Sequence, residues 1–410
     1  MKQNLKNILI SLVLFTLIIF SCEKQKENTE IILKNNLDIA RADEPVTIKK
    51  SALSLPYDQF IIIDEEGLLV PFQKDDLNGD QQWDELALVL DFMPQQQRKL
   101  YIKAQDSLPV FKATTNVRLG KSPERNGTFT DVVFEKRDKK HLPQSQPPLY
   151  QMEGVSWEND KVGFRTYFDS RNGKDIWGKK TPELVLDWVG TKGNYHEMDW
   201  WGMDILKVGN SLGAGALAME KEQQLYRLGE TEDAIYEMVS EGPARTKFRL
   251  HYKGWQVDDH TYNLTEEITL WKGQYCYESQ VTLTDTVTSN LVTGIVNMDA
   301  KELYVDTLDE NYAMLYTHDI QSLNKDHLGM GLIVPKTYFN GYGETAADAA
   351  SISSTYFCKL KPNGQEPVKF YFFAGWEVTD SLFSHKAGFE KMLKENSLKL
   401  NNPIQIEIHQ

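Results

Sequence analysis

Aromatic and charged side chains are concentrated in one stretch of the chain, from Tyr150 to Gly209, which holds five of its nine tryptophans. Aromatic faces stack on sugar rings, whereas arginine and histidine bind anionic groups or transfer protons. The combination predicts a carbohydrate site rather than a plain hydrophobic core. The polar groups that could do chemistry there are Arg165, Arg171, Asp175, Asp187, His196 and Asp199.

Strand alternation is expected to bring two of these groups to one face. Val162, Phe164, Thr166 and Phe168 would face one way, and Lys161, Arg165, Tyr167 and Asp169 the other. Arg165 and Tyr167 should therefore project together, and the following turn could supply Arg171 as a second guanidinium. The alternative is a solvated face on which Arg165 pairs only with Asp169.

His196 has the most catalytic surroundings of the eight histidines, because it lies among aromatic and acidic residues. It could act as a base or an acid near neutral pH, with Asp199 or Glu197 orienting its ring. The alternative is a structural histidine held by hydrogen bonds. His318 and His141 are further candidates with less suitable neighbours.

An acidic loop between two expected strands has the spacing of a cation site. Its ligands would be Asp76, Asn78, Asp80, the carbonyl of Gln82, and Asp84. Calcium prefers six to eight oxygens in flexible geometry, so a structural calcium ion is expected. The loop departs from a helix-loop-helix site, since Gln81 stands where glycine is usual. The alternative is an acidic turn closed by its own side-chain bonds.

The N-terminus resembles a bacterial lipoprotein signal. Residues 1–21 combine a basic start with an apolar core, and Cys22 would become the lipidated first residue. Residues 22–30 would form a polar tether, placing the protein on the outer membrane, on its periplasmic side or at the cell surface. The alternative is an ordinary membrane anchor.

The net charge of the chain limits the kinds of partner that we expect it to bind. Removal of the signal takes two of the 45 basic residues and none of the 59 acidic ones, which leaves a net charge of −16. Nucleic acid is therefore not expected as a partner. An anionic glycan would need a local basic pocket, for which Arg165, Arg171 and the run 136–141 are candidates; that run could equally be a solvated loop.

No organic cofactor is expected. The glycine-rich stretch 209–216 lacks the Lys-Ser/Thr ending of a phosphate loop and is better explained as a turn between strands 204–208 and 215–219. Cys276 and Cys358 could pair outside the cytoplasm, but their separation does not decide it.

The pattern of elements predicts an all-β protein. Residues 31–110 show short strands around 46–48, 60–63, 86–90 and 100–102, typical of a small β-sandwich that carries the acidic loop. Residues 111–410 show long alternating strands, at 263–271, 277–284 and 369–375 among others, typical of a large antiparallel β-sandwich holding the site. Helical spacing is clear only in 386–399, which predicts a short C-terminal helix.

Several runs of the aromatic block resemble a family of bacterial lipoproteins from polysaccharide-degrading marine and gut bacteria. This family was long classed as a domain of unknown function and includes an ulvan oligosaccharide dehydratase. The resemblance covers nearly all of the mature chain, including the loop 76–85. The runs that carry it are 150–169, 175–179, Tyr195–His196 with Asp199–Trp200, and 202–209.

The resemblance implies removal of water from the glucuronate or iduronate at the non-reducing end of ulvan-type oligosaccharides, giving a 4,5-unsaturated uronate. Chemistry then suggests the roles. Arg165 and Arg171 would neutralise the substrate carboxylate, His196 would take the C5 proton, and Tyr167 or Tyr195 would protonate the leaving hydroxyl. Trp200 or Trp201 would floor the sugar, and Asp199 and Lys161 would make further contacts.

Three alternatives remain open. A polysaccharide lyase uses the same β-elimination but expels a sugar instead of water. A surface glycan-binding lipoprotein would need the aromatic residues but no catalytic base. A sugar mutarotase would fit the large sandwich, although no motif favours it.

Overall fold

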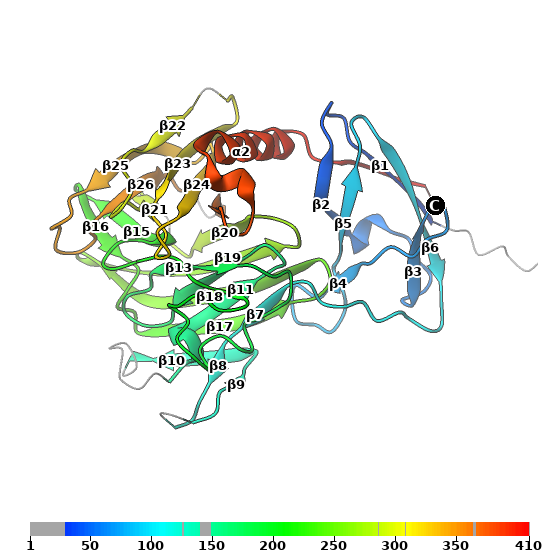
Figure 1. The fold of residues 1–410 in the computed structure, drawn as a ribbon. Helices are drawn as coiled ribbons and strands as arrows, with labels where there is room; N and C mark the ends of the chain where they lie inside the picture. Colours follow the sequence, from blue (N-terminus) through cyan, green and yellow to red (C-terminus); the bar gives the residue numbers. More distant parts are fainter. Residues whose placement is uncertain are drawn as a thin grey trace, which may run out of the picture.

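The structure is a computed structural model that describes residues 29–124, 127–139, 149–285, 287–307, 309–363 and 366–409. The described residues form antiparallel β-sheets with one α-helix near the C-terminus, which confirms the predicted all-β class (Figure 1). Residues 1–28, with the expected signal segment and Cys22, lie outside the described residues. No helix of the described chain is long and apolar enough to cross a membrane.

The N-terminal part forms two small sheets, with strand orders β28-β1-β6-β3 and β2-β5-β4. Alternate residues of these strands, such as Ile31, Phe60 and Leu88, are fully buried between the sheets, as strand periodicity requires. The strands are β1 (Thr29–Lys34), β2 (Arg41–Lys49), β3 (Phe60–Asp64), β4 (Gln73–Asp75), β5 (Glu85–Phe92), β6 (Gln97–Ala104) and β28 (Gln405–His409).

The last strand of the chain returns to this first unit. β28 pairs antiparallel with β1, with Ile408 opposite Ile31, so the C-terminus ends at the small sandwich (Figure 1). The predicted division at residue 110 did not anticipate this, because it placed every later residue in the large sandwich. Thr29 and Glu30, which were expected to end the tether, are instead the first two residues of β1.

One layer of the large sandwich is a nine-stranded antiparallel sheet. The predicted strands 263–271, 277–284 and 369–375 are all found here, with ends within three residues of the prediction. In spatial order the strands are β10 (Phe134–Asp138), β17 (Asp233–Ser240), β18 (Arg245–Val257), β19 (His260–Trp271), β20 (Cys276–Leu283), β27 (Val368–Trp376), β24 (His327–Pro335), β23 (Tyr312–Ile320) and β22 (Tyr304–Asp306).

The opposite layer consists of two five-stranded sheets, bridged between Lys174 and Gly213. The first contains β14 (Gly202–Asp204), β13 (Lys174–Lys179), β12 (Val162–Tyr167), β11 (Gly154–Glu158) and β7 (Asn116–Arg118). The second contains β16 (Gln224–Arg227), β15 (Ala214–Lys221), β21 (Asn290–Val296), β26 (Thr355–Leu360) and β25 (Phe339–Thr345). The predicted strand 204–208 is not formed, because β14 ends at Asp204.

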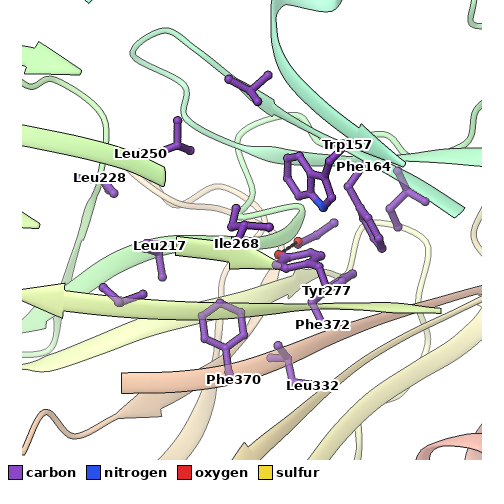
Figure 2. Close-up of a cluster of buried hydrophobic side chains, with 14 of the residues drawn as sticks. Trp157, Phe164, Leu217, Leu228, Leu250, Ile268, Tyr277, Leu332, Phe370 and Phe372 are labelled. Atoms are coloured by element: carbon purple, nitrogen blue, oxygen red, sulfur yellow. Dashed lines mark hydrogen bonds between the residues drawn. The ribbon is translucent and has the colours of Figure 1, made fainter. Parts of the chain in front are cut away.

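Aromatic side chains from both layers interlock in the main core. Trp157 and Phe164 meet Tyr277 of β20 at ring-centroid distances of 5.4 and 4.9 Å, and all three are fully buried (Figure 2). Burying each such side chain contributes roughly 1.5–3 kcal/mol. The Tyr277 hydroxyl also donates a 2.7 Å hydrogen bond to the carbonyl of Ala214, which fixes the spacing of the layers.

The predicted C-terminal helix is present as α2 (Lys386–Asn401). Its buried Phe389 lies directly over Gly329 of β24, where any β-carbon would come within 2.4 Å of the ring. Glycine at this position therefore lets the helix pack closely on the outer face of the nine-stranded sheet.

The remaining elements are short. A two-stranded ribbon pairs β8 (Gly120–Lys121) with β9 (Thr130–Asp131). The 3-10 turns of the described residues are η1 (Lys50–Ala52), η3 (Gln151–Glu153) and η4 (Ser381–Ser384). Cys276 and Cys358 lie on sheets in opposite layers and are both free, so they do not form the disulfide that the sequence left open.

Candidate active site around Arg165 and His196

Arg165 is the buried centre of a charged cluster. It lies on β12 directly opposite Asp175 of β13, so strand register alone brings this ion pair together. Its Nη2 also lies 3.0 Å from Oδ2 of Asp204, which ends the neighbouring strand β14. The Arg165 side chain is completely inaccessible to solvent. The predicted alternative of a solvated face that pairs Arg165 with Asp169 is therefore wrong.

Aromatic rings enclose this guanidinium. Its central carbon lies 4.5 Å from the ring centroid of Tyr167, 4.6 Å from Trp177 and 5.5 Å from Tyr195. Arg165 and Tyr167 project together, as strand alternation predicts, and Nη2 donates to the tyrosine oxygen at 2.9 Å. Burial alone would lower the pKa of Arg165, but the surrounding hydroxyls and carboxylates outweigh it and raise that pKa, so the cation is permanent.

The two carboxylates beside Arg165 are as buried as the arginine. Burial, and then repulsion from Asp204, raise the pKa of Asp175 to about 7, although Arg165 acts against both effects. The side chains of Asp175 and Asp204 are only 2% and 1% exposed. They cannot touch a sugar as a pair of hydrolytic carboxylates would, so they act through the groups that they hold.

His196 is the accessible end of this network. Its Nδ1 lies 3.2 Å from Oδ2 of Asp204, while 53% of its side chain is exposed. The backbone N–H of Asp204 donates to the carbonyl of Tyr195 at 2.8 Å, which ties the loop carrying His196 back to β14. The hydrogen bond to Asp204 raises the pKa of His196. Because Nδ1 faces Asp204, Nε2 is the nitrogen available to a substrate.

The sequence did not identify Asp204 as the carboxylate that orients His196. Asp199 and Glu197, which it favoured, shape the loop instead. Asp199 accepts the backbone N–H of Trp200 at 2.6 Å, and Glu197 accepts the side-chain amide of Asn194 at 2.9 Å. Asp199 is exposed, so a substrate contact for it stays a prediction.

Tyr195 lies between the buried cation and His196. Its ring contacts the His196 ring at a centroid distance of 4.5 Å and packs perpendicular to Trp177 at 5.4 Å. Nη1 of Arg165 reaches the Tyr195 oxygen at 3.5 Å. Burial raises the pKa of Tyr195, and also that of Tyr167, so both hydroxyls are protonated at neutral pH.

Arg171 also contacts the Tyr167 ring, with its central guanidinium carbon 4.0 Å from the ring centroid. It pairs with Asp169 at 3.0 Å and with Glu153 at 3.4 Å, and 35% of its side chain is exposed. Glu153 is a further site residue that the sequence analysis missed. It has a φ of 61° in η3, a left-handed conformation that costs a non-glycine residue energy and often marks a functional site.

The two neighbouring tryptophans, Trp200 and Trp201, differ in their exposure to solvent. Trp200 is 53% exposed and can floor a sugar ring. Trp201 is 2% exposed and packs against Trp177 at a centroid distance of 6.1 Å, so it belongs to the core beneath the site. Direct contact with a substrate is therefore excluded for Trp201 in this conformation.

The chain is similar to a known protein family over most of its length. Residues 33–406 match the family described as Domain of unknown function (DUF4861). The chain belongs to this family. It is 25% identical to "Uncharacterized protein P7" of Formosa agariphila over 415 residues, which cover 95% of each chain.

A solved structure shares the fold of this DUF4861 chain. An α-mannosidase from Enterococcus faecalis V583 aligns with 93% of the chain at 10% identity, with a TM-score of 0.51. A glycosyl hydrolase family 38 protein from Enterococcus faecalis aligns with 93% at 11% identity, with a TM-score of 0.49. The DUF4861 chain spans less than half of each, 46% and 47% of their lengths.

Other predicted residues of the DUF4861 chain lie away from this cluster. Lys161 precedes β12, about 13 Å along the strand from Arg165, and its Nζ lies 3.8 Å from Asp160. His318 binds the carbonyl of Phe383 at 2.8 Å below the C-terminal helix. Lys136 and Lys139 pair with acidic residues, whereas Lys140 and His141 lie outside the described residues.

The acidic loop of the DUF4861 chain is closed by hydrogen bonds to its own backbone. Asp76 accepts the N–H groups of Gly79 and Gln81, Asn78 that of Asp80, Asp80 that of Gln82, and Asp84 that of Leu77, all at 2.7–2.9 Å. In the described part of the chain, no three His, Cys, Asp or Glu side chains are grouped to hold a metal. The calcium ion stays a prediction, since each carboxylate oxygen has a second lone pair that a cation could use.

Proposed function

We propose that this DUF4861 protein is a carbohydrate-active dehydratase. It would remove water from the glucuronate or iduronate at the non-reducing end of an ulvan-type oligosaccharide and leave a 4,5-unsaturated uronate. The observation that carries the proposal is the exposed imidazole of His196, oriented by the buried carboxylate of Asp204 and in ring contact with the protonated Tyr195. A base and an acid side by side are what a β-elimination needs.

His196 and a tyrosine together account for every proton transferred in the reaction. Nε2 of neutral His196 takes the proton from C5, and the electron pair left on C5 forms the C4–C5 double bond. The C4–O bond breaks, and the departing hydroxyl takes a proton from a tyrosine and leaves as water. The imidazolium then returns a proton to the tyrosinate through solvent, so the enzyme ends unchanged.

Tyr195 is a better acid than Tyr167. The Tyr167 hydroxyl donates to Oδ2 of Asp175 at 3.0 Å, so its proton is already engaged. The Tyr195 hydroxyl accepts a long bond from Arg165, and in the described part of the chain it has no acceptor for its own proton. Arg165 lies close enough to stabilise the tyrosinate that forms, which lowers the barrier to proton donation.

The carboxylate of the substrate would be met by Arg171 instead of Arg165. Arg165 is buried and already binds two carboxylates, so it acts as a positioning residue that organises Tyr167, Tyr195 and Asp204. Arg171 is partly exposed at the edge of the same cluster. A guanidinium there could exchange part of its bonding to Glu153 for the substrate carboxylate.

The family resemblance and the sugar-processing fold relative support a carbohydrate substrate, and Trp200 offers a ring platform for it. Cys22 would carry a lipid that anchors the enzyme to the outer membrane. A calcium ion in the loop 76–84 would serve the stability of the small sandwich, without a part in catalysis.

The products test the proposal. Uronate-ended ulvan oligosaccharides incubated with the protein should lose the mass of one water without chain cleavage and gain the ultraviolet absorbance of an enoate. Two fragments, one carrying the double bond, would make the protein a lyase. Binding without any change of mass would make it a glycan-binding protein, and both outcomes would reject the dehydratase.

A further inference from the structure

A cavity of about 490 Å³ adjoins the candidate active site on the side of Arg171. Its wall is formed by the turn after β12, the turn at Gly209 and Asn210, and the strand β16. Its size falls in the range of about 300–1,000 Å³ that is usual for small-molecule sites. Arg171, Tyr226 and Arg227 give it a cationic and aromatic lining.

Arg227 has an unusual environment for an arginine. Its guanidinium donates to three backbone carbonyls, those of Arg171 at 3.0 Å, Asn210 at 2.7 Å and Ser211 at 3.0 Å. In the part of the chain that the structure describes, no carboxylate lies within ion-pair distance of it. Burial lowers the pKa of Arg227 to about 10, with no neighbouring charge to oppose the effect. Three carbonyls use three of its five N–H groups and leave its charge without a counter-ion.

This distinguishes Arg227 from the other two arginines of the region. Arg165 binds Asp175 and Asp204, and Arg171 binds Asp169 and Glu153. A partly buried cation without a counter-ion costs free energy, and an anionic ligand would reduce that cost. The acidic residue among those that line the cavity, Glu230, is exposed.

We propose that this cavity is an anion subsite in which Arg227, beside Arg171, binds the carboxylate or sulfate ester of a sugar. The ring of that sugar would rest against the half-buried Tyr226. Arg171 links the subsite to the active site, because it lines the cavity and also contacts Tyr167. One part of this inference rests on the proposed function: the sugar bound here belongs to the oligosaccharide that is dehydrated.

Binding of three sugars with the same ring tests the subsite without requiring turnover. Glucose, glucuronate and glucose 6-sulfate differ at C6 as neutral hydroxymethyl, carboxylate and sulfate ester. Ligand-observed NMR should show at least one anionic sugar bound about tenfold more tightly than glucose, as a charge-assisted hydrogen bond implies. The tighter of the two identifies the source of the anion.

Variants assign the binding to this cavity. Arg227→Gln should remove the preference for anionic sugars, and Arg227→Lys should retain part of it. Because Arg227 also holds three carbonyls, a second variant spares the fold. Ser351→Trp, at the exposed rim, should fill the cavity and abolish binding, whereas Ser351→Ala should leave it intact.

Equal affinity for all three sugars, or a preference that survives both Arg227→Gln and Ser351→Trp, would overturn the subsite. The dehydratase proposal fails separately. A protein that binds an anionic sugar here but never releases water keeps the subsite and loses the proposed reaction.

Discussion

Nδ1 of His196 lies 3.2 Å from Oδ2 of Asp204, and the same carboxylate oxygen lies 3.0 Å from Arg165. An accessible base is thereby joined to a buried cation through one carboxylate. The hydrogen bond to Asp204 fixes the orientation of the imidazole and raises the pKa of His196. Tyr167, Tyr195 and Asp175 all contact Arg165, so each lies two contacts from this oxygen.

Replacing Asp204 with Asn should lower the pKa of His196 toward its ordinary value, because the stabilising anion is removed. The base must be neutral, so the acidic limb of the rate profile should move to lower pH. An NMR titration of the imidazole measures the same shift without substrate. Asp199→Asn is the matched control and should leave the midpoint unchanged, and an unmoved midpoint in Asp204→Asn would contradict the pairing.

Replacing Arg165 with Met should destabilise the fold by about 3–5 kcal/mol at neutral pH, because two buried carboxylates lose their cation. The loss should be smaller near pH 5, where Asp175, with a pKa raised to about 7, is protonated and needs no partner. Urea unfolding measures both values. Arg171→Met, at a partly exposed site, should cost less than about 1 kcal/mol, and equal losses for the two variants would refute this role for Arg165.

Local rules foresaw only some of this arrangement. Strand alternation predicts that Arg165 and Tyr167 share a face, and helical spacing predicts α2, because both depend on neighbours along the chain. Asp204 lies eight residues beyond His196 and meets it only because the intervening loop folds back on β14. Asp199, closer in sequence, was the more obvious partner. Arg227 gave no signal in the sequence, since what distinguishes it is that no carboxylate of the described residues lies within ion-pair distance.

Long-range pairing and loop conformation were equally hidden. β28 pairs with β1, which lies near the other end of the sequence, and nothing in residues 405–409 predicts that pairing. Trp200 and Trp201 are adjacent in an irregular loop, so no periodicity could tell which one is buried. Glu153 has a left-handed backbone conformation, but the residue is not a glycine, so the sequence did not indicate this conformation.

These two tryptophans offer a second matched pair. Trp200→Ala should weaken binding of oligosaccharides with little effect on stability, because the ring is exposed. Trp201→Ala should cost about 3–5 kcal/mol of stability through the cavity that it leaves beneath the site. Calorimetric titration and thermal unfolding measure the two effects. A Trp200 variant with unchanged affinity would remove this ring from the sugar platform.

Calcium should stabilise the small sandwich if the loop from Asp76 to Asp84 binds it. Millimolar calcium should raise Tm, a chelator should reverse the increase, and the double variant Asp76→Asn, Asp80→Asn should abolish it. Magnesium serves as the control, since it prefers smaller octahedral sites. If calcium leaves Tm unchanged, the loop is held by its hydrogen bonds alone.

The most direct measurement is mass spectrometry of uronate-ended ulvan oligosaccharides incubated with the wild type and with His196→Gln and Tyr195→Phe. The wild type should give a product lighter by one water. Both variants, folded like the wild type, should lose activity by about 100-fold or more, as expected for a missing base or acid. Unchanged dehydration by His196→Gln would contradict the assignment of the base, and an unaltered substrate mass with the wild type would contradict the proposed reaction itself.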